Sequence, residues 1–277
     1  MRVERVGTFV LVRLAFVKAW RSPGLWLWGA LLVSVNFLGS GADGYDPRQQ
    51  PSSLAETFAH ARAHAVQAGA LGALALFLDV WLLVALTRAA LFVLQGRSPS
   101  PNAIVATIRP RWRSILVFSA LFAAGTFLLG AIGVWSWALS FALSGAWSFS
   151  LYLGIPVLAR EPATGVGAVR RAWALVRRCW ARRLTGLFVT GACFVLACGL
   201  CGALAFALMA RGTGSADPSR WPQSWILLLQ LAFAPIGAFF LVVDQVFDAA
   251  LYANLTEGTS PKLPNRVEAE STWRARV

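Results

Sequence analysis

Long apolar runs separated by short polar stretches dominate the hydrophobic pattern of this chain. An α-helix needs about 20 apolar residues to cross the hydrocarbon core of a bilayer. Six runs reach or approach that length, at about 24–40, 68–95, 114–134, 136–158, 185–210 and 224–255. The pattern therefore predicts an all-α, polytopic integral membrane protein with six transmembrane helices.

A longer pattern repeats three times: a basic amphipathic stretch, an apolar run, a turn, and a second apolar run. Each copy ends in a Leu-aromatic pair, at Leu91-Phe92, Leu151-Tyr152 and Leu251-Tyr252. Self-similarity of this kind predicts a repeat architecture. We expect three tandem hairpins at about 1–95, 96–160 and 161–256, forming a single six-helix membrane domain over 1–256. The polar tail 257–277 is expected to be disordered and cytoplasmic.

Composition and charge add a location and an orientation. The chain is 57% hydrophobic and 13% charged, whereas soluble domains are about 25% charged. Of its 25 basic residues, 20 fall in the predicted termini and loops of one side, and Arg88 lies near the same side within a predicted span. Because basic loops stay in the cytoplasm, both termini are predicted to be cytoplasmic. The excess of Arg over Lys, with abundant Ala and Gly, favours a bacterial source and hence the inner membrane.

The basic stretch 164–183 is too polar to cross a membrane and too amphipathic to be a plain loop. At helical spacing, Val169, Trp173, Val176 and Trp180 share one face. We expect an interfacial helix on the cytoplasmic side, with weaker versions at 6–20 and 102–113. The candidate lipid-headgroup ligands are Arg170, Arg171, Arg177, Arg178, Arg182 and Arg183. The charge has two interpretations, enforcing topology alone or contacting anionic lipid or polyphosphate; no nucleic-acid-reading module is present.

Four charged residues lie within the predicted spans, where each carries a cost of about 2.5 kcal/mol or more. Alignment of the Leu-aromatic pairs places Arg88 at the depth of Asp248, which predicts an Arg88–Asp248 or Arg88–Asp244 ion pair. Asp79 precedes Arg88 by nine residues, about 13.5 Å along a helix. It is therefore the candidate proton or cation site, or else a protonated acid that is hydrogen-bonded to a neighbouring helix.

Patterns typical of catalysis are absent from the sequence. There is no phosphate-binding loop and no nucleotide fingerprint, and Cys198-Gly-Leu-Cys201 lies within an apolar run. His60 and His64 have a spacing that can hold a metal, but the chain has no third His. We therefore predict no enzyme activity, no cofactor and no metal site, and leave open whether His60 and His64 bind metal.

One stretch carries a resemblance to a known family. It reads Leu151-Tyr-Leu-Gly-Ile-Pro156-Val-Leu-Ala-Arg160-Glu161, followed by Ala168-Val-Arg170-Arg171-Ala-Trp173 and Cys179-Trp180. With the tandem hairpins, it resembles uncharacterised bacterial six-helix integral membrane proteins, similar to the membrane domain fused to some glycerophosphodiester phosphodiesterases. Nothing here corresponds to the phosphodiesterase domain. The resemblance thus implies a fold and a setting in the cell envelope, without catalytic residues.

These observations lead to two functional hypotheses. The first is a non-enzymatic bacterial inner-membrane protein, an accessory or scaffold that contacts anionic lipid or a membrane-protein partner through its basic helices. The alternative is a small transporter or channel that uses the intramembrane acid Asp79.

Overall fold

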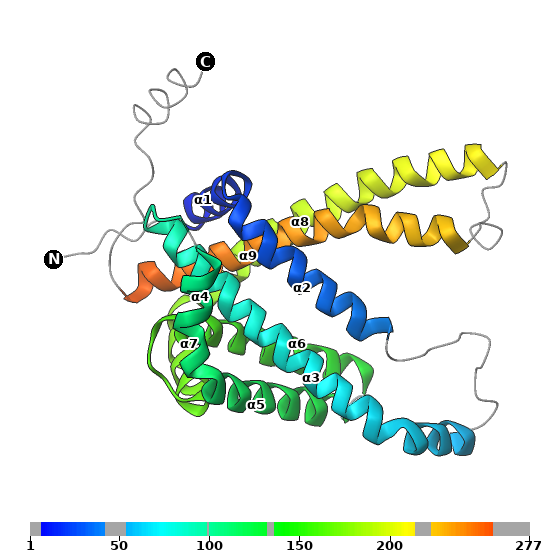
Figure 1. Cartoon of the computed structure of the whole chain (residues 1–277), viewed down its shortest axis with the longest axis horizontal. Helices are drawn as coiled ribbons and strands as arrows, with labels where there is room; N and C mark the ends of the chain where they lie inside the picture. The colour runs from blue at the N-terminus through cyan, green and yellow to red at the C-terminus, as the bar shows by residue number, and fades with distance from the viewer. Residues whose placement is uncertain (1–6, 42–53, 99, 132–135, 214–222, 257–277) are drawn as a thin grey trace. The chain divides into compact units, whose positions relative to one another are not determined.

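The computed structural model describes residues 7–41, 54–98, 100–131, 136–213 and 223–256, and within them it is helical with no strand (Figure 1). This confirms the all-α class. The helices are α1 Thr8–Arg21, α2 Pro23–Gly41, α3 Leu54–Leu94, α4 Pro101–Ile108, α5 Trp112–Ala131, α6 Trp137–Tyr152, α7 Gly154–Arg160, α8 Gly165–Thr213 and α9 Gln223–Thr256, with a 3₁₀ turn over Arg109–Arg111.

Five helical segments are long and apolar enough to cross a membrane, and two of them run through more than one of the helices named above. The segments are Gly72–Leu94, Pro101–Leu129, Ala138–Arg160, Gly165–Gly212 and Ala232–Thr256. They correspond to five of the six predicted spans. The sixth, 24–40, corresponds to α2, in which the described residues give a shorter apolar helix, Pro23–Val35.

Two helices are longer than the predicted spans. α3 is 41 residues long and begins at Leu54, well before the predicted span 68–95. α8 is 49 residues long and runs without a break from the basic stretch into the span 185–210. At 1.5 Å per residue α8 measures about 74 Å, more than twice the thickness of a bilayer core, about 30 Å. The basic stretch and the span, predicted as separate elements, are one helix because no Pro interrupts the sequence around 184 and Gly186 keeps a helical backbone there.

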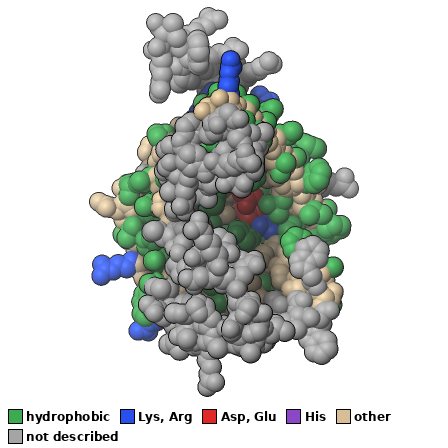
Figure 2. Space-filling model, turned by 90° about the vertical axis from the view of Figure 1, so that its right-hand side faces the viewer, with side chains coloured by type: hydrophobic (Ala, Val, Ile, Leu, Met, Phe, Trp, Pro, Cys, Tyr) green, Lys and Arg blue, Asp and Glu red, His purple; other side chains and the backbone are tan. Residues whose placement is uncertain are grey.

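The surface of the C-terminal half of α8 is apolar and exposed. Only 6% of its most apolar window is buried, against 61% for the corresponding windows of α3 and α9. The side chains of Val195, Leu196, Leu200, Leu204 and Leu208 are all more than 60% exposed. Hydrophobic side chains also cover much of the described surface in Figure 2. Soluble monomers rarely expose so large an apolar surface, so this helix has the surface of one that faces lipid.

The contacts divide the chain into two compact units, each discontinuous in sequence. The first comprises the described parts of Met1–Gly29, Leu86–Pro101 and Arg177–Val277, and the second comprises those of Ala30–Ala85 and Asn102–Val176.

In the first unit, α1 and α8 both pack against α9. The ring of Phe16 lies 5.9 Å from the rings of Phe239 and Phe240, and Phe240 also contacts Phe194 of α8 at 5.3 Å. α8 and α9 run side by side in antiparallel directions (Figure 1). Aromatic packing on two sides of α9 makes it the central helix of this unit.

In the second unit, α5 and α6 pack closely in antiparallel directions. Gly125 of α5 lies against the indole of Trp147 of α6. The indole Nε1 donates to the carbonyl of Phe122 at 3.4 Å. Ser140 Oγ of α6 donates to the carbonyl of Leu129 of α5 at 2.9 Å.

Arg111 caps the end of α7. It donates to three carbonyls there, those of Leu158, Arg160 and Glu161, at 2.6–3.3 Å. A cation at a helix C-terminus satisfies carbonyls that have no partner within the helix.

Candidate functional site

A row of small and apolar residues on α8 forms its buried side. Ala168, Ala172, Leu175, Cys179, Gly186 and Thr190 are buried and follow one another at intervals of three, four or seven residues. Arg183 fills the seven-residue gap between Cys179 and Gly186 and is therefore directed inward with them. Gly186 allows the close approach of α9, since a Cβ at that position would overlap the ring of Phe247.

Arg183 forms a bidentate ion pair with Asp248 of α9 inside the first unit. Arg183 Nε lies 3.0 Å from Asp248 Oδ1, and one terminal nitrogen lies 3.0 Å from Oδ2. Each side chain is 1% exposed. Two parallel charge-assisted hydrogen bonds of this geometry engage both oxygens of the carboxylate. The ion pair thereby joins α8 to α9.

This ion pair corrects two predictions. Asp248 is paired with Arg183, whereas the aligned repeats predicted Arg88 as its partner. Arg183, grouped by sequence with the lipid-headgroup candidates, is buried and contacts a carboxylate instead. The physical reason is helical phase, since Arg183 lies on the buried row of α8 whereas its basic neighbours do not.

Further polar contacts surround the ion pair. Thr87 of α3 donates to Gln245 Oε1 at 2.9 Å, and both residues are buried. Arg182 donates from both terminal nitrogens to Asn254 Oδ1 at 3.3 Å. We call the residues Thr87, Arg182, Arg183, Gln245, Asp248 and Asn254 the polar cluster. It joins α3, α8 and α9 within the first unit, so buried hydrogen bonds as well as apolar packing hold these helices in register.

Two other predicted residues lie near this cluster. Asp244 precedes Asp248 by one helical turn on α9, and its buried Oδ1 accepts no hydrogen bond within the described residues. The guanidinium carbon of Arg88 lies 4.8 Å above the ring of Phe92, one turn further along α3. A guanidinium over an aromatic face gains a cation–π attraction.

Asp79 belongs to the other unit. It lies on α3 in the part assigned to the second unit and is half-buried. Arg88, Asp244 and Asp248 all belong to the first unit.

The exposed side of α8 carries the other headgroup candidates. Arg170, Trp173, Arg177 and Trp180 are all exposed and follow one another at intervals of three and four residues. We call these four residues the Arg–Trp row. Arg171 comes directly after Arg170, and Arg178 comes directly after Arg177. Both are also exposed. Arg171 Nε lies 3.6 Å from Glu161 Oε1, with 47% of its side chain exposed. An exposed pair of this kind contributes little to stability.

The described residues include no group of three or more His, Cys, Asp or Glu side chains that could hold a metal ion. The side chains of His60 and His64, the outer segment before residue 54, and the tail 257–277 lie outside what the structure describes. The four cysteines are free thiols, and none of them forms a disulfide.

Comparison with known proteins identifies no relative. No protein-family model, curated protein or solved structure matches the chain. The resemblance carried by residues 151–180 therefore stays a prediction.

Proposed function

We propose that this chain is a non-enzymatic integral protein of the bacterial inner membrane, an accessory or scaffold component that contacts anionic lipid through α8. The observation that carries the proposal is the Arg–Trp row. Its arginines and indoles alternate along one exposed side of the helix, opposite the row that packs into the protein.

Alternation of these two side chains suits the boundary between headgroups and acyl chains. Trp173 and Trp180 are 43% and 58% exposed, and indole rings concentrate at the level of the headgroups. The guanidinium groups of Arg170 and Arg177 are then at the depth of lipid phosphates, which they bind in a bidentate manner. Further along the same side, Leu184 and Phe188 are 52% and 76% exposed. The row therefore passes from a basic end to an apolar end, as expected of a helix that enters the bilayer there.

The proposal is tested by measuring which lipids the full-length protein retains. The protein is reconstituted into nanodiscs of mixed phosphatidylcholine and phosphatidylglycerol, and the lipid ratio around it is compared with the input ratio. Each basic residue near an anionic surface contributes about 1 kcal/mol. We expect phosphatidylglycerol to be enriched around the native protein, and the enrichment to weaken at high salt. The variant R170Q/R171Q/R177Q/R178Q should lose most of it.

A variant that preserves charge is the matched control. R170K/R171K/R177K/R178K should retain most of the enrichment because its net charge is unchanged. If the glutamine variant enriches phosphatidylglycerol as well as the native protein does, the arginines of α8 serve topology alone and the proposal fails.

A further inference from the structure

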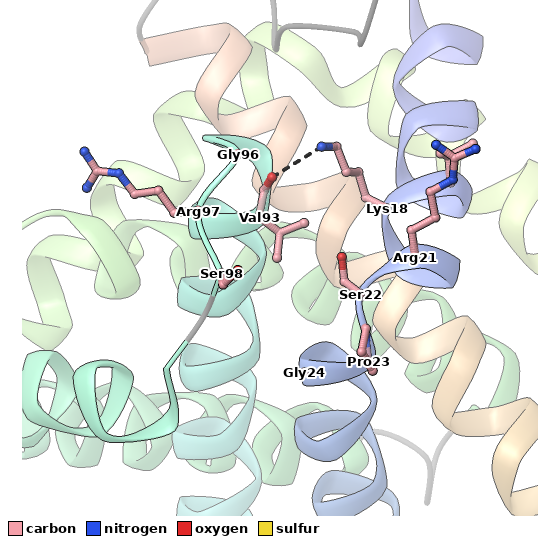
Figure 3. Close-up of a pocket in the computed structure, with 10 residues that line it drawn as sticks. Lys18, Arg21, Ser22, Pro23, Gly24, Val93, Gly96, Arg97 and Ser98 are labelled. Carbon is pink, nitrogen blue, oxygen red and sulfur yellow. Dashed lines mark hydrogen bonds between the residues drawn. The ribbon is translucent and has the colours of Figure 1, made fainter. Parts of the chain in front are cut away.

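A cavity of about 410 Å³ opens in the first unit where the ends of α1 and α3 meet the start of α2 (Figure 3). Its polar lining is basic: Lys18 and Arg21 come from α1, and Arg97 comes from the turn after α3. Among the described residues that line it there is no acidic side chain. Three cations around one cavity, with no carboxylate among the described lining residues, form a site suited to an anion.

Turn chemistry brings these residues together. α1 ends at Arg21, only Ser22 separates it from α2, and Pro23 begins α2, which is the helical position that Pro prefers. α3 ends in a Schellman turn. Gly96 has φ +76°, its N–H donates to Val93 at 3.1 Å, and the N–H of Arg97 donates to Phe92 at 2.9 Å. The left-handed Gly96 turns the chain so that Arg97 lies beside the cavity.

The side chains have two different roles. Lys18 Nζ reaches across the cavity and donates to the carbonyl of Val93 at 3.4 Å, which joins α1 to the end of α3. In Figure 3 the guanidinium groups of Arg21 and Arg97 extend outward on opposite sides, while the Ser22 hydroxyl points towards the space between them. Arg21 and Arg97 are exposed. Their long stems leave them free to rotate over a ligand without any movement of the backbone.

The backbone adds a further attraction for negative charge. The N-terminus of α2 borders the cavity at Pro23 and Gly24. Pro23 has no N–H, and the N–H of Leu25 donates to the carbonyl of Ser22 at 2.9 Å, so Gly24 carries the first N–H of α2. The helix dipole favours an anion there. Gly24 has no side chain that would keep a ligand away from its N–H.

We infer that this cavity binds one phosphate group, held by Lys18, Arg21 and Arg97 together with Ser22 and the first turn of α2. A volume of 410 Å³ lies within the range of ligand pockets, about 300–1,000 Å³. It therefore accommodates a phosphate with a small polar substituent. The ligand is a phosphate ester, either the headgroup of an anionic phospholipid or a soluble phosphate. This discrete, saturable site is separate from the Arg–Trp row of α8 and does not depend on the proposed function.

The test uses the purified full-length protein in a neutral detergent. Its binding of inorganic phosphate, glycerol phosphate and short-chain phosphatidylglycerol is measured by isothermal titration calorimetry and by thermal stabilisation. We expect saturable binding that weakens at least tenfold in the variants K18Q and R97Q. Lys18 also joins two helices, whereas the described contacts give the Arg97 side chain no such role, so R97Q keeps the test valid if K18Q fails to fold. R113Q, the control, loses the same charge outside the cavity and should bind as the native protein does.

The three probes separate the sources of phosphate. Binding of glycerol phosphate or inorganic phosphate, lost in R97Q, establishes a site for soluble phosphate. Binding of phosphatidylglycerol alone, lost in R97Q, establishes a headgroup site. Absence of saturable binding, or binding that R97Q and K18Q leave unchanged, overturns the inference. The α8 variant R170Q/R171Q/R177Q/R178Q should keep this binding, so failure of the lipid-contact proposal and failure of the phosphate site are distinguishable.

Discussion

At the scale of single residues, the position of a side chain around its helix decides whether it is buried, even between neighbours of the same type. Arg182 and Arg183 are adjacent in a basic run, yet Arg183 is 1% exposed and Arg182 is only partly buried. Arg183 lies four residues after Cys179 and three before Gly186, on the row that packs against α9. That phase could have been recognised in the sequence. Its partner could not, because aligned repeats give a common depth and not the neighbour that a carboxylate faces.

The buried ion pair makes a stability prediction. D248N leaves the guanidinium of Arg183 buried without its counter-ion, and breaking a buried pair from one side costs about 3–5 kcal/mol. We expect a marked fall in the thermal unfolding temperature of the detergent-solubilised protein, followed by intrinsic Trp fluorescence. Replacement of both partners by apolar residues, R183M/D248L, should recover most of the loss because it leaves no unpaired charge.

The exposed R178Q is the control for this prediction and should unfold near the native temperature. If D248N also unfolds at the native temperature, the pair between Arg183 and Asp248 does not stabilise the packing of α8 on α9.

At the scale of elements, the sequence located the apolar helices better than it located their ends. The length of an apolar run is set by the bilayer, so five spans fall where the hydrophobic pattern placed them. A helix end requires a terminating signal, and α8 contains no Pro between Gly165 and Thr213, while its glycines keep helical backbone angles. The contact between Gly186 and Phe247 was not predicted, because a glycine in an apolar run does not show which ring will face it.

The contact between Gly186 and Phe247 makes the prediction at this scale. In G186A the new methyl group would overlap the Phe247 ring, and overpacking of this kind costs about 1–3 kcal/mol. We expect a lower thermal unfolding temperature, partly restored in G186A/F247L, where the flat ring is removed.

Gly191 provides the matched control on the same helix, since a Cβ there would meet no heavy atom within 4 Å. G191A should be neutral or slightly stabilising, because Ala favours a helix over Gly by about 1 kcal/mol. Equal destabilisation by G186A and G191A would contradict the close approach of α8 and α9 at Gly186.

At the scale of the whole molecule, the apolar runs predicted the class, and long-range contacts determined the organisation. An all-α chain with several long apolar helices follows from runs of about 20 apolar residues. The division into two discontinuous units does not, because each unit combines segments far apart in the sequence, such as Met1–Gly29 with Arg177–Val277. Local periodicity carries no information about which distant segments meet.

The orientation of the chain depends on α2, and this gives the last prediction. α2 has 19 residues, about 28 Å at 1.5 Å per residue, which approaches the thickness of a bilayer core, about 30 Å. If α2 crosses with the other five segments, the number of crossings is even, and the basic excess places both termini in the cytoplasm. A reporter active only outside the cytoplasm should be silent when fused after residue 277, and a fluorescent reporter that folds only in the cytoplasm should be bright there. The same outside-active reporter fused after residue 45, between α2 and α3, is the control and should give a signal. A strong outside signal after residue 277 would instead mean five crossings, with α2 lying on one side of the membrane.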